Sequence, residues 1–175
     1  MMNYATIKKY DVANGPGVRV SLFVSGCTHH CEGCFNKEAW DFNYGKPFTD
    51  KEMDEIIEAL KPNYINGLSL LGGEPFECSN QKCLLELVKR VKETYPEKSI
   101  WAYSGYLFDE DILEKQCPKQ EETKELISYI DVLVDGEFMR DLKNPNLFYR
   151  GSSNQRIIDV KKSLQENKTI LHEKN

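Results

Sequence analysis

Three cysteines close together in the sequence are the residues best suited to chemistry. Cys27, Cys31 and Cys34 form a C-x3-C-x2-C pattern directly after the apolar run 18–24. A structural zinc site uses four protein ligands, and a cubane iron–sulfur cluster has four irons. Three thiolates on one short loop therefore predict a metal centre that keeps one coordination position open for a reaction. The alternative is a zinc knuckle in which one of the two histidines of this loop supplies the fourth ligand.

Alternating strands and helices must position this loop. Short apolar runs predict strands at 18–24, 67–71, 99–103 and 131–134. Strand, helix, strand, helix is typical of a parallel sheet with right-handed crossovers. Helices are expected from the capping box of Thr49 and Glu52 to Pro62, around Leu84, Leu87, Val88 and Val91 before Pro96, in a short segment capped by Asp109, and around Leu126, Ile127 and Ile130.

Small and acidic residues follow the ends of the predicted strands. The cysteine loop follows the first strand, the Gly-Gly-Glu-Pro segment 72–75 the second, Ser104 and Gly105 the third, and Asp135 the fourth. In parallel α/β sheets ligands bind at the carboxyl ends of the strands. A single glycine there is explained by a tight turn, but four signals at one edge indicate a binding site.

Length and charge limit the possible partners. The 175 residues fit one domain, at 1–160, and a polar tail at 161–175 whose end we expect to fray. The net charge of −5 argues against nucleic acid or an anionic membrane as a partner. The sequence has no apolar leader or membrane-length stretch, which predicts a cytoplasmic protein. Thiols stay reduced there, so the six cysteines favour metal or redox chemistry over disulfides.

The cysteine triplet resembles the signature of the radical S-adenosylmethionine (SAM) enzymes, in which three cysteines hold a 4Fe-4S cluster and SAM binds the unique iron. The Gly-Gly-Glu-Pro segment resembles the motif with which that family holds the methionine amino group. The resemblance implies an α/β fold, namely a partial (β/α) barrel of mostly parallel strands, of the short radical SAM type. It also implies two cofactors, one 4Fe-4S cluster per chain and SAM.

The same resemblance assigns site residues. The cluster ligands are Cys27, Cys31 and Cys34, and the residues near SAM are Gly33, Cys34, Phe35, Gly73, Glu74, Ser104 and Asp135. Glu74 is expected to add a counter-charge for the methionine ammonium, and Ser104 and Asp135 are candidates for the carboxylate or ribose, with a cap or a turn as equal alternatives. A Cβ at Gly73 is expected to intrude on SAM while leaving the cysteine loop untouched.

Six further segments look like the activating proteins of anaerobic ribonucleoside-triphosphate reductases, and the match covers residues 4 to 160. Phe35 stands where tyrosine is commoner, and the tail is longer than usual. The resemblance implies reductive cleavage of SAM, a glycyl radical on the large subunit of the reductase, and a one-electron donor such as flavodoxin. The matching segments are 14–17, 23–27, 33–36, Trp40, 134–138 and 150–155.

Several alternatives remain open on the sequence. The chain could be another small radical SAM enzyme, either a pyruvate formate-lyase type activase or a small-molecule modifier, or a zinc-binding module without catalysis. His29 and His30 are expected to stabilise the loop or face solvent, and the segment 150–156 is either a polar surface loop or a docking edge for the reductase. The spacing of Cys78, Cys83 and Cys117 gives little support for a second cluster.

Overall fold

Parallel strands form the centre of one mixed sheet. The computed structural model describes residues 1–175, with strands β1 (Asn3–Asp11), β2 (Val18–Val24), β3 (Lys46–Pro47), β4 (Ile65–Gly72), β5 (Ser99–Ser104), β6 (Val132–Asp135) and β7 (Arg156–Asp159). They lie side by side in the order β3-β1-β2-β4-β5-β6-β7. β2, β4, β5 and β6 pair in parallel, whereas β1 and β7 pair antiparallel with their neighbours on the two sides.

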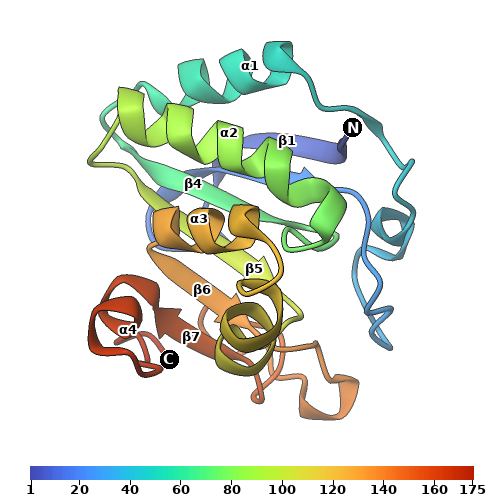
Figure 1. Ribbon diagram of the computed structural model, residues 1–175. Coiled ribbons are helices and arrows are strands. Elements are labelled where there is room, and N and C mark those ends of the chain that lie inside the picture. The colour runs from blue at the N-terminus through green and yellow to red at the C-terminus, as the bar shows by residue number, and fades with distance from the viewer.

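Helices cover one face of the sheet. They are α1 (Asp50–Leu60), α2 (Cys78–Thr94), α3 (Glu121–Tyr129) and α4 (Val160–Glu166), with 3-10 turns η1 (Lys37–Trp40) and η3 (Arg140–Leu142) and the π-helical segment η2 (Phe108–Gln116). α1, α2 and α3 lie on the same face, and α4 lies beside β7 (Figure 1). The core of 27 buried residues fills the space between this face and the helices, for example Leu22, Leu70, Ile100 and Leu87. No helix is long and apolar enough to cross a membrane.

The opposite face of the sheet has a different composition. Trp101 packs there with Val132, Val134 and Ile157. Arg19 is fully buried on β2 and has no carboxylate partner; its guanidinium donates instead to hydroxyls and backbone carbonyls of β4 and β5. Burial lowers the pKa of Arg19 to about 10, so the side chain stays charged at neutral pH. Arg19 and its hydrogen-bond partners thus lie on the face of the sheet that the helices leave uncovered.

The predicted elements are confirmed where the sequence pattern is local. The strand at 18–24 and the start of α1 after Thr49, whose N–H donates to Glu52 over 2.8 Å, agree with the structure. β4 and β5 are slightly longer than the predicted strands, and β6 is shifted by one residue toward the carboxyl end. The helix predicted over 84–91 extends well beyond these residues at its amino end and by three residues at its carboxyl end. β1, β3, β7 and α4 were not predicted. β1 and β7 carry many polar side chains and pair antiparallel through contacts that the sequence pattern does not show.

The α/β class is therefore confirmed, and the sheet is rich in parallel pairs. It does not close on itself, so the expected partial barrel is not established by this sheet. The parallel pairing brings the carboxyl ends of four strands to one edge: Val24 lies beside Gly72, and Ser104 beside Asp135. The loops that follow these residues consequently meet at the same edge.

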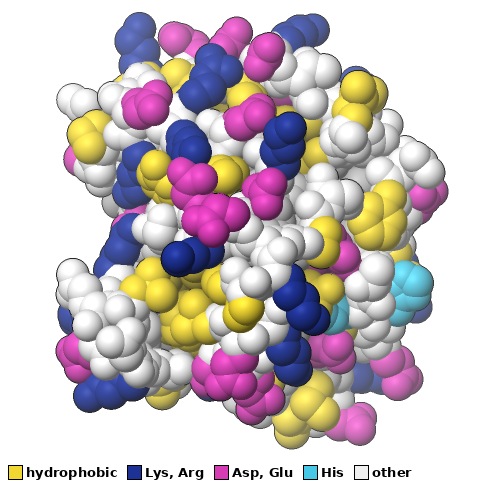
Figure 2. Space-filling model, viewed as in Figure 1, with side chains coloured by type: hydrophobic (Ala, Val, Ile, Leu, Met, Phe, Trp, Pro, Cys, Tyr) yellow, Lys and Arg dark blue, Asp and Glu magenta, His cyan; other side chains and the backbone are white.

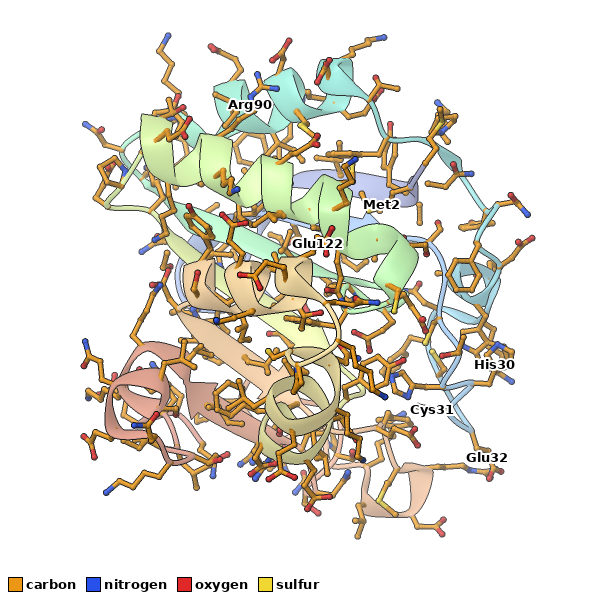
Figure 3. All side chains as sticks on the ribbon, viewed as in Figure 1. Met2, His30, Cys31, Glu32, Arg90 and Glu122 are labelled. Atoms are coloured by element: carbon orange, nitrogen blue, oxygen red, sulfur yellow. The ribbon has the colours of Figure 1, made fainter.

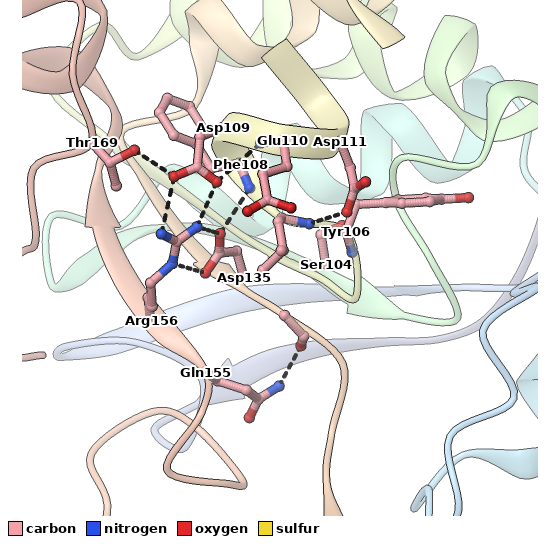
Figure 4. Close-up of polar contacts among 12 residues, drawn as sticks. Ser104, Tyr106, Phe108, Asp109, Glu110, Asp111, Asp135, Gln155, Arg156 and Thr169 are labelled. Carbon is pink, nitrogen blue, oxygen red and sulfur yellow. Dashed lines mark hydrogen bonds and ion pairs between the residues drawn. The ribbon is translucent and has the colours of Figure 1, made fainter. Parts of the chain in front are cut away.

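One ionic network around the buried Asp135 fixes the carboxyl-terminal third (Figure 4). Arg156 donates to the fully buried Asp135 over 2.6 Å and to Asp109 over 3.0 Å, and Thr169 donates to the same Asp109. The expectation that Asp109 caps a helix is wrong, because its carboxylate binds Arg156 and the cap of η2 is Leu107. The side-chain hydrogen bond from Arg156 holds the pKa of Asp109 well below its usual range.

The carboxyl-terminal tail packs along the outer edge of β7. α4 follows β7 directly, and the chain then returns along this strand. The His172 N–H donates to the Ile157 carbonyl over 2.8 Å, and the Ile157 N–H donates to the Asn175 side chain over 2.8 Å. These bonds satisfy backbone groups on the outer edge of β7, which is why the tail is held.

Arg156→Met would leave the Asp135 carboxylate buried without its cation. We expect this change to lower the free energy of unfolding by about 3 kcal/mol or more, because an unpaired buried charge is costly. Arg140→Met is the matched control, since its pair with Glu32 is exposed and should cost less than about 1 kcal/mol. Urea unfolding of both variants measures the difference, and equal losses would contradict this account of the network.

Candidate functional site

The cysteine loop leaves the sheet at a sharp backbone turn after β2. Gly26 has φ of +98°, and a Cβ there would lie 2.3 Å from the Phe42 ring. The Gly26 N–H donates to the Ala39 carbonyl over 2.8 Å, and the Cys27 N–H donates to the Trp40 carbonyl over 3.2 Å. The turn η1 thus holds the first cysteine in place. Figure 3 shows His30, Cys31 and Glu32 on the loop that projects beyond the sheet.

The three thiols line one cavity of about 470 Å³. Burial raises the pKa of Cys27 to about 12, with the nearby Glu74 and Glu77 adding to the shift, and burial also raises the pKa of Cys31. Both side chains are therefore neutral thiols at pH 7 in the free protein. Metal ligation requires the thiolate, so binding must release protons and overcome this shift. The Cys34 sulfur accepts the Asn36 N–H over 3.4 Å, a contact that suits a thiolate.

Neither histidine of the loop is placed as a ligand. Both ring nitrogens of His29 contact carboxylates, Glu74 at 3.0 Å and Glu137 at 2.8 Å. Burial lowers the pKa of His29, but these two carboxylates outweigh it and raise the pKa to about 9. His30 stacks on Trp40 with ring centroids 4.4 Å apart. The expected loop-stabilising role is thus confirmed for His29, and no three His, Cys, Asp or Glu side chains converge on a single-ion site.

Glu74 lies at the junction of three loops, and only 1% of it is exposed. Its carboxylate accepts the Ser104 hydroxyl at 2.8 Å, the N–H groups of Gly105 at 2.7 Å and Phe76 at 2.8 Å, and His29. These donors occupy both oxygens. Glu74 lines the cavity, but its charge is compensated by His29 rather than held free for an ammonium.

A second glutamate, Glu77, was missed by the sequence analysis. It is buried at the start of α2 and accepts both the N–H and the hydroxyl of Thr28, over 2.7 and 2.6 Å. Because Thr28 directly follows Cys27, Glu77 fixes the beginning of the cysteine loop against the start of α2. A second acidic residue two positions after the Gly-Gly-Glu-Pro segment is the one signal that could have indicated this role.

Gly73 contacts the protein itself where a contact with SAM alone was expected. Its N–H donates to the Val24 carbonyl over 2.7 Å. A Cβ built on Gly73 would lie 2.6 Å from the Gly26 carbonyl oxygen and 2.9 Å from that of Ala39. The expectation that such a Cβ leaves the cysteine loop untouched is therefore wrong, because these two carbonyls form the base of that loop.

The remaining expected residues divide into two groups. Phe35 lines the cavity and is largely exposed, and Ser104 lines it with a hydroxyl that already binds Glu74 and the Tyr106 N–H. Gly33 and Asp135 do not line the cavity: Gly33 lies against Phe138, and Asp135 binds Arg156 and the Phe108 N–H. The structure thus brings the three cysteines, Phe35, Gly73, Glu74 and Ser104 around one space.

The β6–β7 loop, residues 136–155, forms a wall that the sequence analysis did not predict. Its lining residues include Phe138, Lys143, Tyr149, Arg150 and Gln155. The Gln155 amide accepts the Gly151 and Ser152 N–H groups and donates to the Gly136 carbonyl over 3.0 Å (Figure 4). The segment 150–156 therefore builds the wall, a role that neither of its two sequence interpretations included.

The other three cysteines lie outside the cavity. Cys78 is exposed at the start of α2, where its sulfur contacts the Gln120 amide at 2.8 Å. Cys83 and Cys117 are half-buried and pack against the core. Burial raises the pKa of Cys83 to about 11, so this side chain behaves as a small apolar group.

Glu74→Gln would replace an acceptor of four hydrogen bonds by an amide with one acceptor oxygen. We expect it to lower the free energy of unfolding by about 3 kcal/mol, because buried donors lose their partner. Glu137→Gln is the matched control, since Glu137 holds the same histidine from an exposed position, and we expect a loss of about 1 kcal/mol or less. The free energies of unfolding of the two variants are compared by urea denaturation monitored by circular dichroism. A Glu74→Gln protein as stable as the control would contradict the conclusion that Glu74 holds the three loops together.

Comparisons with known proteins agree with this geometry. The chain matches the model of the 4Fe-4S single cluster domain over residues 13–158. It is 44% identical over 156 residues to the anaerobic ribonucleoside-triphosphate reductase-activating protein of Escherichia coli K12, which covers 88% of this chain and 96% of that protein. The protein of the same name from Haemophilus influenzae is 45% identical over 158 residues, with 89% and 97% covered.

A viral relative extends the comparison. The anaerobic ribonucleoside-triphosphate reductase-activating protein of Enterobacteria phage T4 is 44% identical over 156 residues, which is 89% of this chain and 93% of the phage protein. The matches span nearly the full length of each relative, and the matched domain contains all three cysteines that line the cavity. The chain therefore belongs to the family of anaerobic ribonucleoside-triphosphate reductase-activating proteins, with a 4Fe-4S single cluster domain.

Proposed function

We propose that this protein is a radical SAM activase that generates a glycyl radical on the large subunit of the anaerobic ribonucleoside-triphosphate reductase. One observation carries the proposal: Cys27, Cys31 and Cys34 share one cavity, and the histidine that lines the same cavity, His29, is bound to two carboxylates and unavailable as a fourth ligand. A three-thiolate centre keeps one iron position free for SAM. The names of the relatives support the reductase as the partner.

The donor set fits an iron–sulfur cluster. Thiolates are the usual ligands of 4Fe-4S clusters. The Cys34 sulfur accepts a hydrogen bond from the Asn36 N–H, and hydrogen bonds to ligand sulfurs adjust the reduction potential of such clusters. The cavity of about 470 Å³ also lies within the range of roughly 300–1,000 Å³ typical of small-molecule sites. Cluster and SAM thus have adjoining space, within a domain for which we propose the partial-barrel architecture of radical SAM enzymes.

The chain's own residues would position the cofactors. Phe35 offers an exposed ring for the adenine, and the backbone at Gly73 lies next to the cysteine loop, where the methionine end would bind. Glu74 and Ser104 act on this end through their hydrogen bonds to the loops. We propose that Gly33 acts through its backbone in the cysteine loop. We assign Asp135 to the ionic network with Arg156 instead of to SAM.

When bound, the cluster and SAM would supply a 5′-deoxyadenosyl radical, which takes a hydrogen atom from a glycine Cα of the reductase. The protein's task is to hold SAM rigidly and limit access of water. The cavity wall formed by the β6–β7 loop serves this task. We propose that the protein works in the cytoplasm with a one-electron donor such as flavodoxin.

Removal of one ligand tests the cluster assignment. Cys31→Ala leaves two thiolates in the loop, so we expect most of the iron and sulfide to be lost after anaerobic reconstitution. Cys83→Ala is the control, because Cys83 packs against the core outside the cavity and should retain the iron content of the parent. Iron and sulfide assays decide. Equal losses in both variants would show that the ligands are assigned wrongly.

The complete reaction tests the activase function. Protein, SAM, reductant and reductase should give a glycyl radical, seen by electron paramagnetic resonance as a doublet from coupling to the remaining Cα hydrogen. Deuterium placed on the glycine Cα should appear in 5′-deoxyadenosine. A reaction in which the reductase gains no radical, while the same protein consumes SAM to modify a small molecule, would replace this proposal by the small-molecule alternative.

A further inference from the structure

The β6–β7 loop has two faces with different surroundings. Its inward side chains line the cavity and include Phe138, Lys143, Leu147 and Tyr149. Three sequence neighbours of these residues do not line the cavity and are exposed large hydrophobics, namely Met139, Leu142 and Phe148. Phe148 is 67% exposed. We call these three outward residues the outer apolar face.

The outer apolar face is held in a fixed arrangement. The Ser153 N–H donates to the Leu142 carbonyl over 2.9 Å, and the Met139 N–H donates to the Ser152 hydroxyl over 3.1 Å. Arg140 donates to Glu32 of the cysteine loop over 2.8 Å, so this face is also tied to the loop with the ligands. Figure 1 shows the β6–β7 loop below the sheet, on the side of the cysteine loop. The outer apolar face thus places three exposed hydrophobic side chains on one hydrogen-bonded loop beside the cavity of the cysteines, where they can contact a partner protein.

The positive charge of Lys143 indicates which kind of protein segment could bind beside the outer apolar face. Lys143 lies at the cavity wall, 5.4 Å from the centre of the exposed Phe35 ring, and forms no ion pair within the chain. A free cation beside apolar side chains is complementary to a segment that combines apolar residues with a carboxylate.

We infer that the outer apolar face, Met139, Leu142 and Phe148, with Lys143 beside it, is the docking surface for the reductase. This inference rests on the proposed function and adds where the partner binds. A glycine Cα of another protein can reach the cavity only through its mouth, and the outer apolar face is continuous with the wall of that mouth. The segment that docks carries apolar side chains and an acidic residue next to the target glycine.

Other apolar surfaces are less suited to this partner. Leu113, Cys117, Ile127 and Leu164 line a hollow between η2, α3 and α4, and Figure 2 shows hydrophobic side chains gathered there. That hollow lies on the helix-covered face and shares no residue with the cavity of the cysteines. Tyr64 is exposed just before β4, at the amino ends of the parallel strands and thus at the opposite edge.

Two variants of the outer apolar face and one matched control test the inference. Phe148→Ser and Leu142→Ser should each weaken binding of the cluster-loaded protein to the reductase by about tenfold or more, as expected for a central apolar contact. Tyr64→Ser, which removes an aromatic ring 59% exposed, should bind like the parent. Affinity is measured anaerobically by titration of labelled reductase. Release of 5′-deoxyadenosine under dithionite without reductase should match the parent in all three variants.

The outcomes separate this inference from the proposed function. Weaker reductase binding with unchanged SAM cleavage in both loop variants supports the docking surface. Parent-like binding in both, or an equal loss in Tyr64→Ser, overturns it while the activase function stands. Loss of SAM cleavage together with binding shows that the loop acts on the cavity, which also overturns docking. A parent protein that neither cleaves SAM nor binds the reductase removes the proposed function itself.

Discussion

The buried carboxylate of Glu74 is the interaction on which the arrangement of the cavity depends. It joins the loop after β2 through His29, its own loop after β4 through the Phe76 N–H, and the end of β5 through Ser104 and Gly105. A buried carboxylate is tolerated only when hydrogen bonds and a counter-charge replace its hydration. The hydrogen bonds that Glu74 accepts therefore fix the distances between the three loops. Glu77 adds a similar link, because its carboxylate accepts the Thr28 N–H and connects the start of α2 to the cysteine loop.

Elements with local patterns were predictable from the sequence. The central strands are short apolar runs, and α1 has a capping box with Glu52. The parallel order of these elements places Cys27, Gly73 and Ser104 at one edge, as expected from the apolar runs and from the residues that directly follow them. The cysteine spacing predicted an iron–sulfur centre, and the match to the 4Fe-4S single cluster domain agrees with this prediction.

Features that depend on distant partners were not predictable. The hydrogen bonding of Glu74 was not predicted because three of its four donors come from the distant positions 29, 104 and 105, and only Phe76 is near in the sequence. Asp135 looked like part of the site because it ends a strand, yet Arg156 and the Phe108 N–H occupy it. The wall formed by residues 136–155 has no periodic pattern, and its shape depends on the amide of Gln155. Such roles need three-dimensional contacts.

The tail beside β7 has a consequence for solubility. An open sheet presents unpaired N–H and C=O groups along its outermost strands, and such edges promote strand addition between molecules. Here one edge ends in the two-residue β3 with Pro47, which lacks an N–H, and the other is covered by the backbone of residues 170–172. The β7 edge is thus closed to strand addition by the chain's own tail, whereas on the other side β3 pairs only with Asn3 and Tyr4 of the nine-residue β1.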